Sequence, residues 1–119
     1  MAEIAHSGLV NTREGRISVT WANVTESGTF EAVDLSGVFG APFIVSIQIA
    51  DTVGGATTAI HGSLDGTNYA ALGDITGTAI AMTAANDIAE IGETAIYYKP
   101  VASGGSSQSI DCTMIFWMV

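Results

Sequence analysis

The chain has 119 residues, of which twelve are acidic and three basic, and its formal net charge at neutral pH is −9. Duplex-binding proteins typically neutralise about six to ten phosphates with lysine and arginine, so this composition argues against a nucleic-acid partner. With 48% hydrophobic and 13% charged residues, the chain is too apolar for a disordered acidic tail and must fold around a core.

The bulk properties favour one domain without a membrane span. Apolar residues occur in short runs, none near the roughly 18 to 20 residues that cross a bilayer, so no membrane partner is expected. The first ten residues lack the basic start and long apolar segment of a secretory signal. The single cysteine, Cys112, cannot form an internal disulfide, which fits synthesis in a reducing cytosol.

Residues 1–16 differ from the rest of the chain. They contain two arginines and two glutamates, have no net charge and show little alternation, so they are expected to form an extended N-terminal arm. The β domain then comprises residues 17–119, which hold one basic and ten acidic residues and therefore the whole charge of −9. A fully extended arm of this length reaches about 50 Å and can contact a neighbouring molecule.

Alternation of apolar and polar residues recurs through the domain and predicts β-strands. In the segment 43–49, for example, Phe43, Val45 and Ile47 share one parity. The eight or nine predicted strands cover residues 17–21, 30–35, 43–49, 58–64, 69–72, 78–83, 88–91, 95–101 and 109–118. Short strands separated by glycine-rich turns are typical of an antiparallel sandwich or barrel.

Two local patterns need separate treatment. Asp65-Gly66 predicts a type I′ turn in a hairpin from Ile60 to Leu72, because both central residues of that turn have positive φ. The apolar residues at 80, 84, 88 and 91 have helical spacing, so a short helix remains an alternative to strands across 80–91.

The C-terminal strand is apolar on both parities. If Cys112 and Phe116 face the core, then Ile115, Trp117 and Val119 point to the opposite face and need a second cover. A segment of the same chain or another subunit can provide it. We favour an oligomer interface formed by Ile115, Trp117 and Val119.

Few residues suggest catalysis. His61, Ser63 and Asp65 share one parity and can form a polar cluster, but a solvated sheet face is the simpler interpretation. Cys112 is expected to be a small buried hydrophobe, because no activating cation is near it in the sequence. We therefore expect a non-enzymatic protein and predict no catalytic residues.

No metal or other cofactor is expected. The chain has three histidine and cysteine residues in total, whereas a structural zinc site uses four ligands. Loop carboxylates can bind calcium only if their loops meet at one end of the fold, and the candidates are Asp51, Asp65, Asp74 and Asp87. The candidates for a sugar-stacking platform are Trp21, Tyr69, Tyr97 and Tyr98, but alternation places them on no common face.

The second half of the chain resembles a known group of virion proteins. The sequence GSLDGTNY at 62–69, a Gly-Thr-rich strand at 77–83, YYKPV at 97–101, a Gly-Ser linker and a closing alternating strand carry the resemblance. They are similar to small β-sandwich proteins encoded among tailed-bacteriophage virion genes. That group includes capsid decoration, or cement, proteins.

We therefore expect an antiparallel β-sandwich of jelly-roll type. The resemblance implies synthesis in the bacterial host cytoplasm and a virion location on the outer capsid surface. There a decoration protein, often a homotrimer, bridges major capsid protein subunits and stabilises the shell. The arm residues expected to contact the capsid are Ile4, Leu9, Val10, Arg13 and Arg16. The alternative is a head-fibre or tail adhesin module that binds a host-surface glycan.

Overall fold

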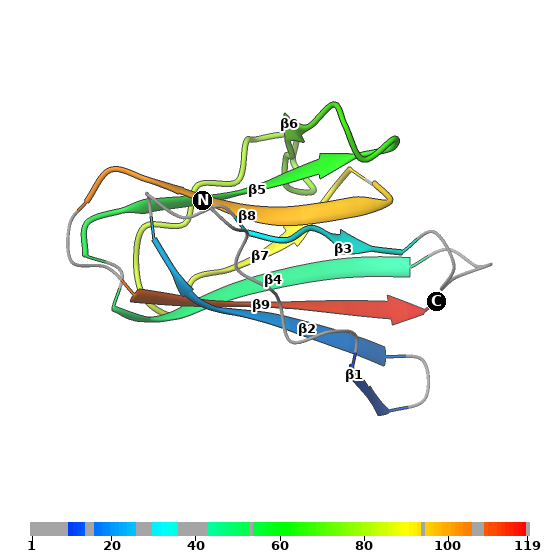
Figure 1. The fold of residues 1–119 in the computed structure, drawn as a ribbon, viewed down its shortest axis with the longest axis horizontal. Coiled ribbons are helices and arrows are strands. Elements are labelled where there is room, and N and C mark those ends of the chain that lie inside the picture. The colour runs from blue at the N-terminus through cyan, green and yellow to red at the C-terminus, as the bar shows by residue number, and fades with distance from the viewer. Residues whose placement is uncertain are drawn as a thin grey trace.

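The computed structural model describes residues 10–13, 16–25, 30–35, 43–52, 54–93, 95–105 and 109–118. Within these residues the chain forms nine strands and no helix. The strands make two antiparallel sheets that lie one above the other (Figure 1). The all-β prediction is confirmed, and the two sheets are compatible with the expected β-sandwich.

One sheet has five strands, with β9 at its centre. In spatial order they are β1 (Val10–Arg13), β2 (Arg16–Val24), β9 (Ser109–Met118), β4 (Phe43–Thr52) and β7 (Ile88–Ile91). Strand β9 pairs along most of its length with β2 on one side and β4 on the other. The C-terminal segment is therefore an inner strand, although it lies at the end of the sequence.

The other sheet has four strands. In spatial order they are β3 (Val33–Asp34), β8 (Tyr97–Ser103), β5 (Thr57–Ser63) and β6 (Ala70–Ala71). From β2 onward, the chain passes from one sheet to the other at every connection except that between β5 and β6. Residues from distant parts of the sequence therefore lie side by side on each face.

The helical alternative for residues 80–91 is wrong. Ile80 and Met82 face the core in extended backbone, and Met82 exchanges two backbone hydrogen bonds with Thr58. A turn follows, held by the Asp87 carboxylate, which accepts hydrogen bonds from the Thr83 and Ala84 amides. Ile88 is 67% exposed, so its helical spacing with Ile80 does not correspond to a shared buried face.

Strand β1 extends the five-stranded sheet into the segment that was expected to be an arm. Val10 lies opposite Ser18 and Arg13 opposite Arg16, with a register shift between them. Ile4 and Leu9 lie outside the described residues.

No helix in the described part of the chain is long and apolar enough to cross a membrane.

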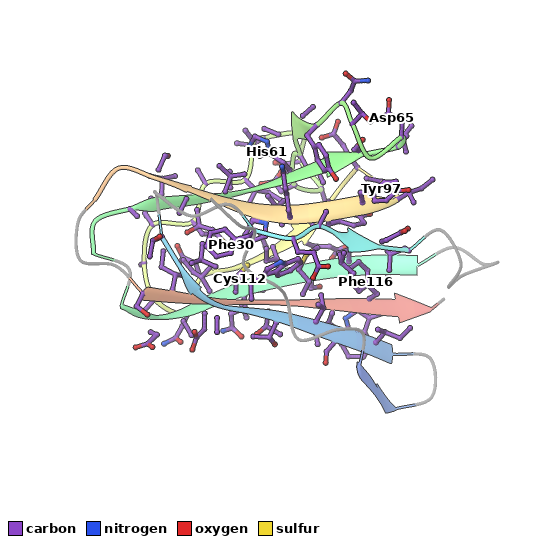
Figure 2. The ribbon with its side chains drawn as sticks, in the orientation of Figure 1. Phe30, His61, Asp65, Tyr97, Cys112 and Phe116 are labelled. Carbon is purple, nitrogen blue, oxygen red and sulfur yellow. The ribbon has the colours of Figure 1, made fainter. Side chains whose placement is uncertain are left out.

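The core between the sheets joins β8 to β9 through an aromatic pair. Tyr98 and Phe116 are fully buried and meet edge to face with ring centroids 5.5 Å apart, a favoured aromatic geometry. The Tyr98 hydroxyl accepts a hydrogen bond from the Ala95 amide at 2.8 Å. Phe30, Cys112 and Phe116 all point into this layer (Figure 2).

One buried side-chain polar group is unsatisfied among the residues that the structure describes. Thr58 is fully buried on β5, and its hydroxyl has no hydrogen-bond partner. Its backbone groups are paired with Met82. The hydroxyl therefore contributes a desolvation penalty, which for a buried unpaired polar group is about 1–3 kcal/mol.

We expect Thr58→Val to stabilise the protein, because valine keeps the shape of the side chain and removes the unpaired hydroxyl. The free energy of unfolding should rise by about 1 kcal/mol, and Tm by about 4 °C. Urea unfolding followed by circular dichroism measures the change. The control, Thr57→Val at the half-buried neighbouring position, should stay within about 0.5 kcal/mol of the parent. A lower stability for Thr58→Val would contradict the unpaired hydroxyl.

Candidate functional site

The outer face of the five-stranded sheet carries large apolar side chains that the core does not use. On β9, Ile115 is half-buried and Trp117 is 40% exposed. Ile44, which is 41% exposed, lies opposite Trp117 on β4, and the exposed Ile88 lies on β7. Three strands that are distant in the sequence therefore build one apolar surface.

A groove crosses this surface above β4. It has a volume of about 260 Å³ and is lined by Ser46, Ile47, Gln48, Ile88, Thr113, Ile115 and Trp117. We call it the outer groove. Its lining is mostly apolar and contains no ionisable residue, so it offers no acid or base. An uncharged apolar element of a partner protein matches this chemistry.

The groove contains two of the three residues predicted for the oligomer interface. Ile115 and Trp117 lie on the outer face, as alternation predicts for a strand whose other parity is buried. Val119 lies outside the described residues. Whether Ile115 and Trp117 contact another subunit stays a prediction.

Two of the predicted arm contacts, Arg13 and Arg16, are placed together by the pairing of β1 with β2. Arg13 ends β1 and is the register partner of Arg16, which begins β2 and also lies opposite Trp117 on β9. The hairpin therefore brings two of the three basic residues of the chain to one corner of the five-stranded sheet. We call Arg13 and Arg16 the basic corner.

The hairpin between β5 and β6 is confirmed, but the type I′ turn is wrong. His61 pairs with Ala71 and Gly62 with Ala70, so the loop spans residues 64–69. Gly66 has a φ of 79°, whereas Asp65 is not among the residues with positive φ. A longer loop replaces the two-residue turn because Asp65 stabilises it through its side chain.

The Asp65 carboxylate accepts hydrogen bonds from several groups of its own loop. The donors are the amides of Thr67 and Asn68, both at 2.8 Å, the Asn68 side chain at 2.7 Å and the Ser63 hydroxyl at 2.8 Å. These donors, with the Asn68 and Thr67 amides foremost, hold the pKa of Asp65 well below its usual value. The loop is thus organised around one charged carboxylate.

A second loop repeats this arrangement around Asp74. Its carboxylate accepts hydrogen bonds from the Thr76 hydroxyl at 2.6 Å, the Thr76 amide at 2.8 Å and the Thr78 amide at 3.1 Å. The bonds from Thr76 lower the pKa of Asp74. Each loop also exposes one large aliphatic side chain, Leu64 in the first and Ile75 in the second.

The structure joins two residues of the possible polar cluster by a hydrogen bond. Ser63 is buried and donates to Asp65. His61 lies opposite Lys99 on β8 and away from Asp65 (Figure 2). Burial and then the charge of Lys99 lower the pKa of His61, so the imidazole is held neutral at neutral pH. The hydrogen bond between Ser63 and Asp65 belongs to the loop that the Asp65 carboxylate stabilises.

The aromatic candidates divide between the core and the outer face of the four-stranded sheet. Trp21 and Tyr98 are fully buried, and the Trp21 indole donates to the Glu31 carbonyl at 2.7 Å. On the outer side, the Lys99 ammonium lies 4.3 Å from the centre of the Tyr69 ring. Tyr97 packs against Gly66, where an added Cβ would lie only 3.2 Å from its ring.

Cys112 behaves as expected for a buried side chain. It is fully buried between the sheets, and burial raises the pKa of its thiol to about 12. Among the described residues, no three histidine, cysteine or acidic side chains lie close enough to hold a metal ion. The carboxylates of Asp65 and Asp74 instead accept hydrogen bonds from their own loops.

Replacing each loop aspartate by alanine should release only the amides that it holds. Asp65→Ala should speed hydrogen exchange at Thr67 and Asn68, and Asp74→Ala should speed it at Thr76 and Thr78. Each variant is the control for the other in amide-resolved NMR. Equal effects of one variant on both loops would show that the carboxylates do not act locally.

The same loops should respond to acid in a defined direction. Because the folded pKa of Asp65 lies below the ordinary value of 3.8 for an aspartate, its stabilising contribution is fully present above that value. It is lost as the pH falls below 3.8 and through the folded pKa. Exchange at Thr67, corrected for intrinsic rates, should therefore stay constant between neutral pH and about pH 5. Loss of protection above pH 5 would contradict the hydrogen-bonded carboxylate.

Comparisons with known proteins give no match for this chain. No protein-family model matches it, and neither a curated protein nor a solved structure does. Its function is therefore argued from the fold, the outer groove, the basic corner and the loops themselves.

Proposed function

We propose that this chain is a non-enzymatic capsid decoration protein of a tailed bacteriophage. It binds the outer surface of the mature head and bridges major capsid protein subunits, which stabilises the shell. The observation that carries this proposal is the apolar, uncharged outer groove on an otherwise strongly acidic domain. Such a surface is suited to protein contacts.

The strand order supports a jelly-roll sandwich as part of this proposal. With β1 set aside as an added edge strand, the sheets have the orders β2-β9-β4-β7 and β3-β8-β5-β6. Eight strands in two sheets, connected mainly by crossings between the sheets, are typical of jelly rolls, an architecture common in viral capsid domains. An architecture serves many functions, so the strand order supports the proposal without carrying it.

The basic corner supplies the contact to the shell. Arg13 is the last residue of the edge strand β1 and lies opposite Arg16 on β2, and the expected contacts Ile4 and Leu9 precede β1 in the sequence. Arginine pairs with carboxylates in two-pronged geometry, and an edge strand can add a partner strand through backbone hydrogen bonds. The remaining acidic surface faces solvent and keeps particles apart.

The alternative, a glycan-binding adhesin module, requires that Tyr69 and Tyr97 on the outer side offer free ring faces to a sugar. Glycan stacking uses the flat faces of aromatic rings, yet Tyr69 has Lys99 over one face and Tyr97 packs against Gly66. Both rings thus make contacts within the chain. The decoration function is the better supported of the two.

The direct test adds the purified protein to expanded heads that lack it. We expect the protein to cosediment with the heads and to raise their disruption temperature. An adhesin would bind host cells and leave the heads unchanged. Failure to bind and to stabilise such heads would refute the proposal.

A charge reversal tests the basic corner. Arg13→Glu should weaken head binding about tenfold, a loss of about 1.4 kcal/mol. The matched control is Lys99→Glu, which makes the same change of charge on the four-stranded sheet and should leave binding unaltered. Equal losses for both variants would assign the effect to net charge instead of to the corner.

A further inference from the structure

The single lysine of the chain lies beside a histidine on the outer face of the four-stranded sheet. Lys99 on β8 is the register partner of His61 on β5, and both side chains are half-buried. Residues directly opposite each other on antiparallel strands have Cβ atoms about 4.5–5.5 Å apart and project from the same face. The register therefore places an ammonium group and an imidazole next to each other.

The Lys99 ammonium is held in place, but not by a carboxylate. It lies 4.3 Å from the centre of the Tyr69 ring, where a cation is attracted to the aromatic face. Among the described residues, no ion pair joins Lys99 to an acidic side chain. An ammonium group has three N–H donors, so donors that point away from the ring are available to a ligand.

This pairing is unfavourable on a strongly acidic chain. Opposite charges on facing strand positions stabilise a sheet, whereas like charges destabilise it. Residues 17–119 contain ten acidic residues and one basic residue, yet that basic residue faces a histidine. Proteins break local rules of this kind mainly at functional sites. The pair therefore indicates a ligand that compensates two basic side chains.

We propose that Lys99 and His61 form a binding site for an oxyanion, either a carboxylate or a tetrahedral anion of the sulfate and phosphate type. The ammonium of Lys99 donates to one oxygen of the anion and an imidazole N–H of His61 donates to another. Neutral imidazole keeps one N–H donor, so the site also works when His61 is uncharged. It lies on the four-stranded sheet, away from the outer groove and the basic corner, and thus goes beyond the decoration function.

The net charge of −9 opposes anions at long range, but contacts at the site outweigh it. At physiological ionic strength, exposed charges more than about 8 Å apart are largely screened. A bound oxyanion lies within hydrogen-bond distance of both donors. The acidic residue closest to His61 along the chain is Asp65, whose carboxylate accepts hydrogen bonds from amides of its own loop.

Other ionisable groups near the pair are few in the described part of the sheet. On β8, Tyr97 shares the outer face with Lys99, and Asp34 on β3 lies opposite Tyr97. On the other side of His61, strand β6 contributes only alanines, and Tyr69 precedes it. Lys99 is therefore the main charge that acts on the imidazole of His61, together with burial.

Occupancy of the site is coupled to the proton on His61. Burial and then the charge of Lys99 lower the pKa of His61. A bound anion acts in the opposite direction, because a nearby negative charge favours the imidazolium. Since this coupling is reciprocal, the anion binds more tightly once the pH falls below the pKa of His61.

The test follows the imidazole resonances of His61 by NMR during a pH titration of the full chain. Chloride solution is compared with sulfate and with formate solution at the same ionic strength, because both oxyanions stay ionised over the titration. We expect the pKa of His61 to rise by about 0.5 in at least one oxyanion, which corresponds to about threefold tighter binding to the imidazolium form. A larger rise in formate identifies a carboxylate ligand, and a larger rise in sulfate identifies a tetrahedral one.

Three variants separate the site from general effects of charge. Lys99→Gln removes the ammonium and should abolish the rise, whereas Lys99→Arg keeps the charge and should retain it. Arg13→Gln removes the same charge from the five-stranded sheet and should leave the rise unchanged.

The same pKa of His61 in chloride, sulfate and formate would overturn the inference. So would an equal rise at the other histidine, His6, since that would reflect the solution and not the site. A rise that persists in Lys99→Gln, with native near-ultraviolet circular dichroism, would also overturn it. The titration uses the free chain, so its outcome is independent of whether the protein binds heads.

Discussion

The structure depends on one constraint, the placement of a strand that is apolar on both faces at the centre of a sheet. Strand β9 pairs with β2 and β4, so its backbone groups are satisfied on both sides. Its inner side chains, among them Met114 and Phe116, are fully buried in the core. Its outer side chains, Ile115 and Trp117, reach the surface and line the outer groove. One segment thus contributes both to the buried core and to the apolar outer groove.

The two sheets have different outer faces as a consequence. The outer face of the five-stranded sheet has an uncharged groove, with the basic corner at one edge. The four-stranded sheet carries the remaining basic residue, Lys99, beside His61 and over Tyr69. Its loops are held by the carboxylates of Asp65 and Asp74. This division matches a molecule that contacts protein through one sheet and presents a polar surface with the other.

Charge patterning along the chain predicted part of this division. The neutral first sixteen residues and the acidic remainder are visible in the sequence, and two of the three basic residues precede residue 17. The structure adds that Arg13 and Arg16 are register partners in a hairpin. A strand at 10–13 was not predicted, because its sequence, VNTR, is short and polar and pairs only through contact with β2.

Period-two alternation predicted most strands, because it reports burial of one face. It correctly placed Cys112 inward and Trp117 outward. It failed for residues 78–83, which form no strand. Ile80 and Met82 are buried there, but the segment joins its neighbours through isolated bridges at Ala79 and Met82. The prediction of a type I′ turn was wrong for a different reason. Turn propensity identified Asp65 as a turn residue, but it did not reveal the hydrogen bonds that the Asp65 carboxylate accepts. The groove was not predictable, because it needs the register of β4, β7 and β9.

The most direct test of the central claim observes Trp117 itself. The chain has two tryptophans, and the fully buried Trp21 serves as an internal reference. In protein labelled with 5-fluorotryptophan, the fluorine resonance of Trp117, assigned with Trp117→Phe, should shift between H₂O and D₂O in dilute samples. That solvent shift should disappear when the protein binds expanded heads and the outer face becomes covered, while Trp21 shows none throughout. A solvent shift of Trp117 that persists on bound heads would contradict the outer face as a contact surface.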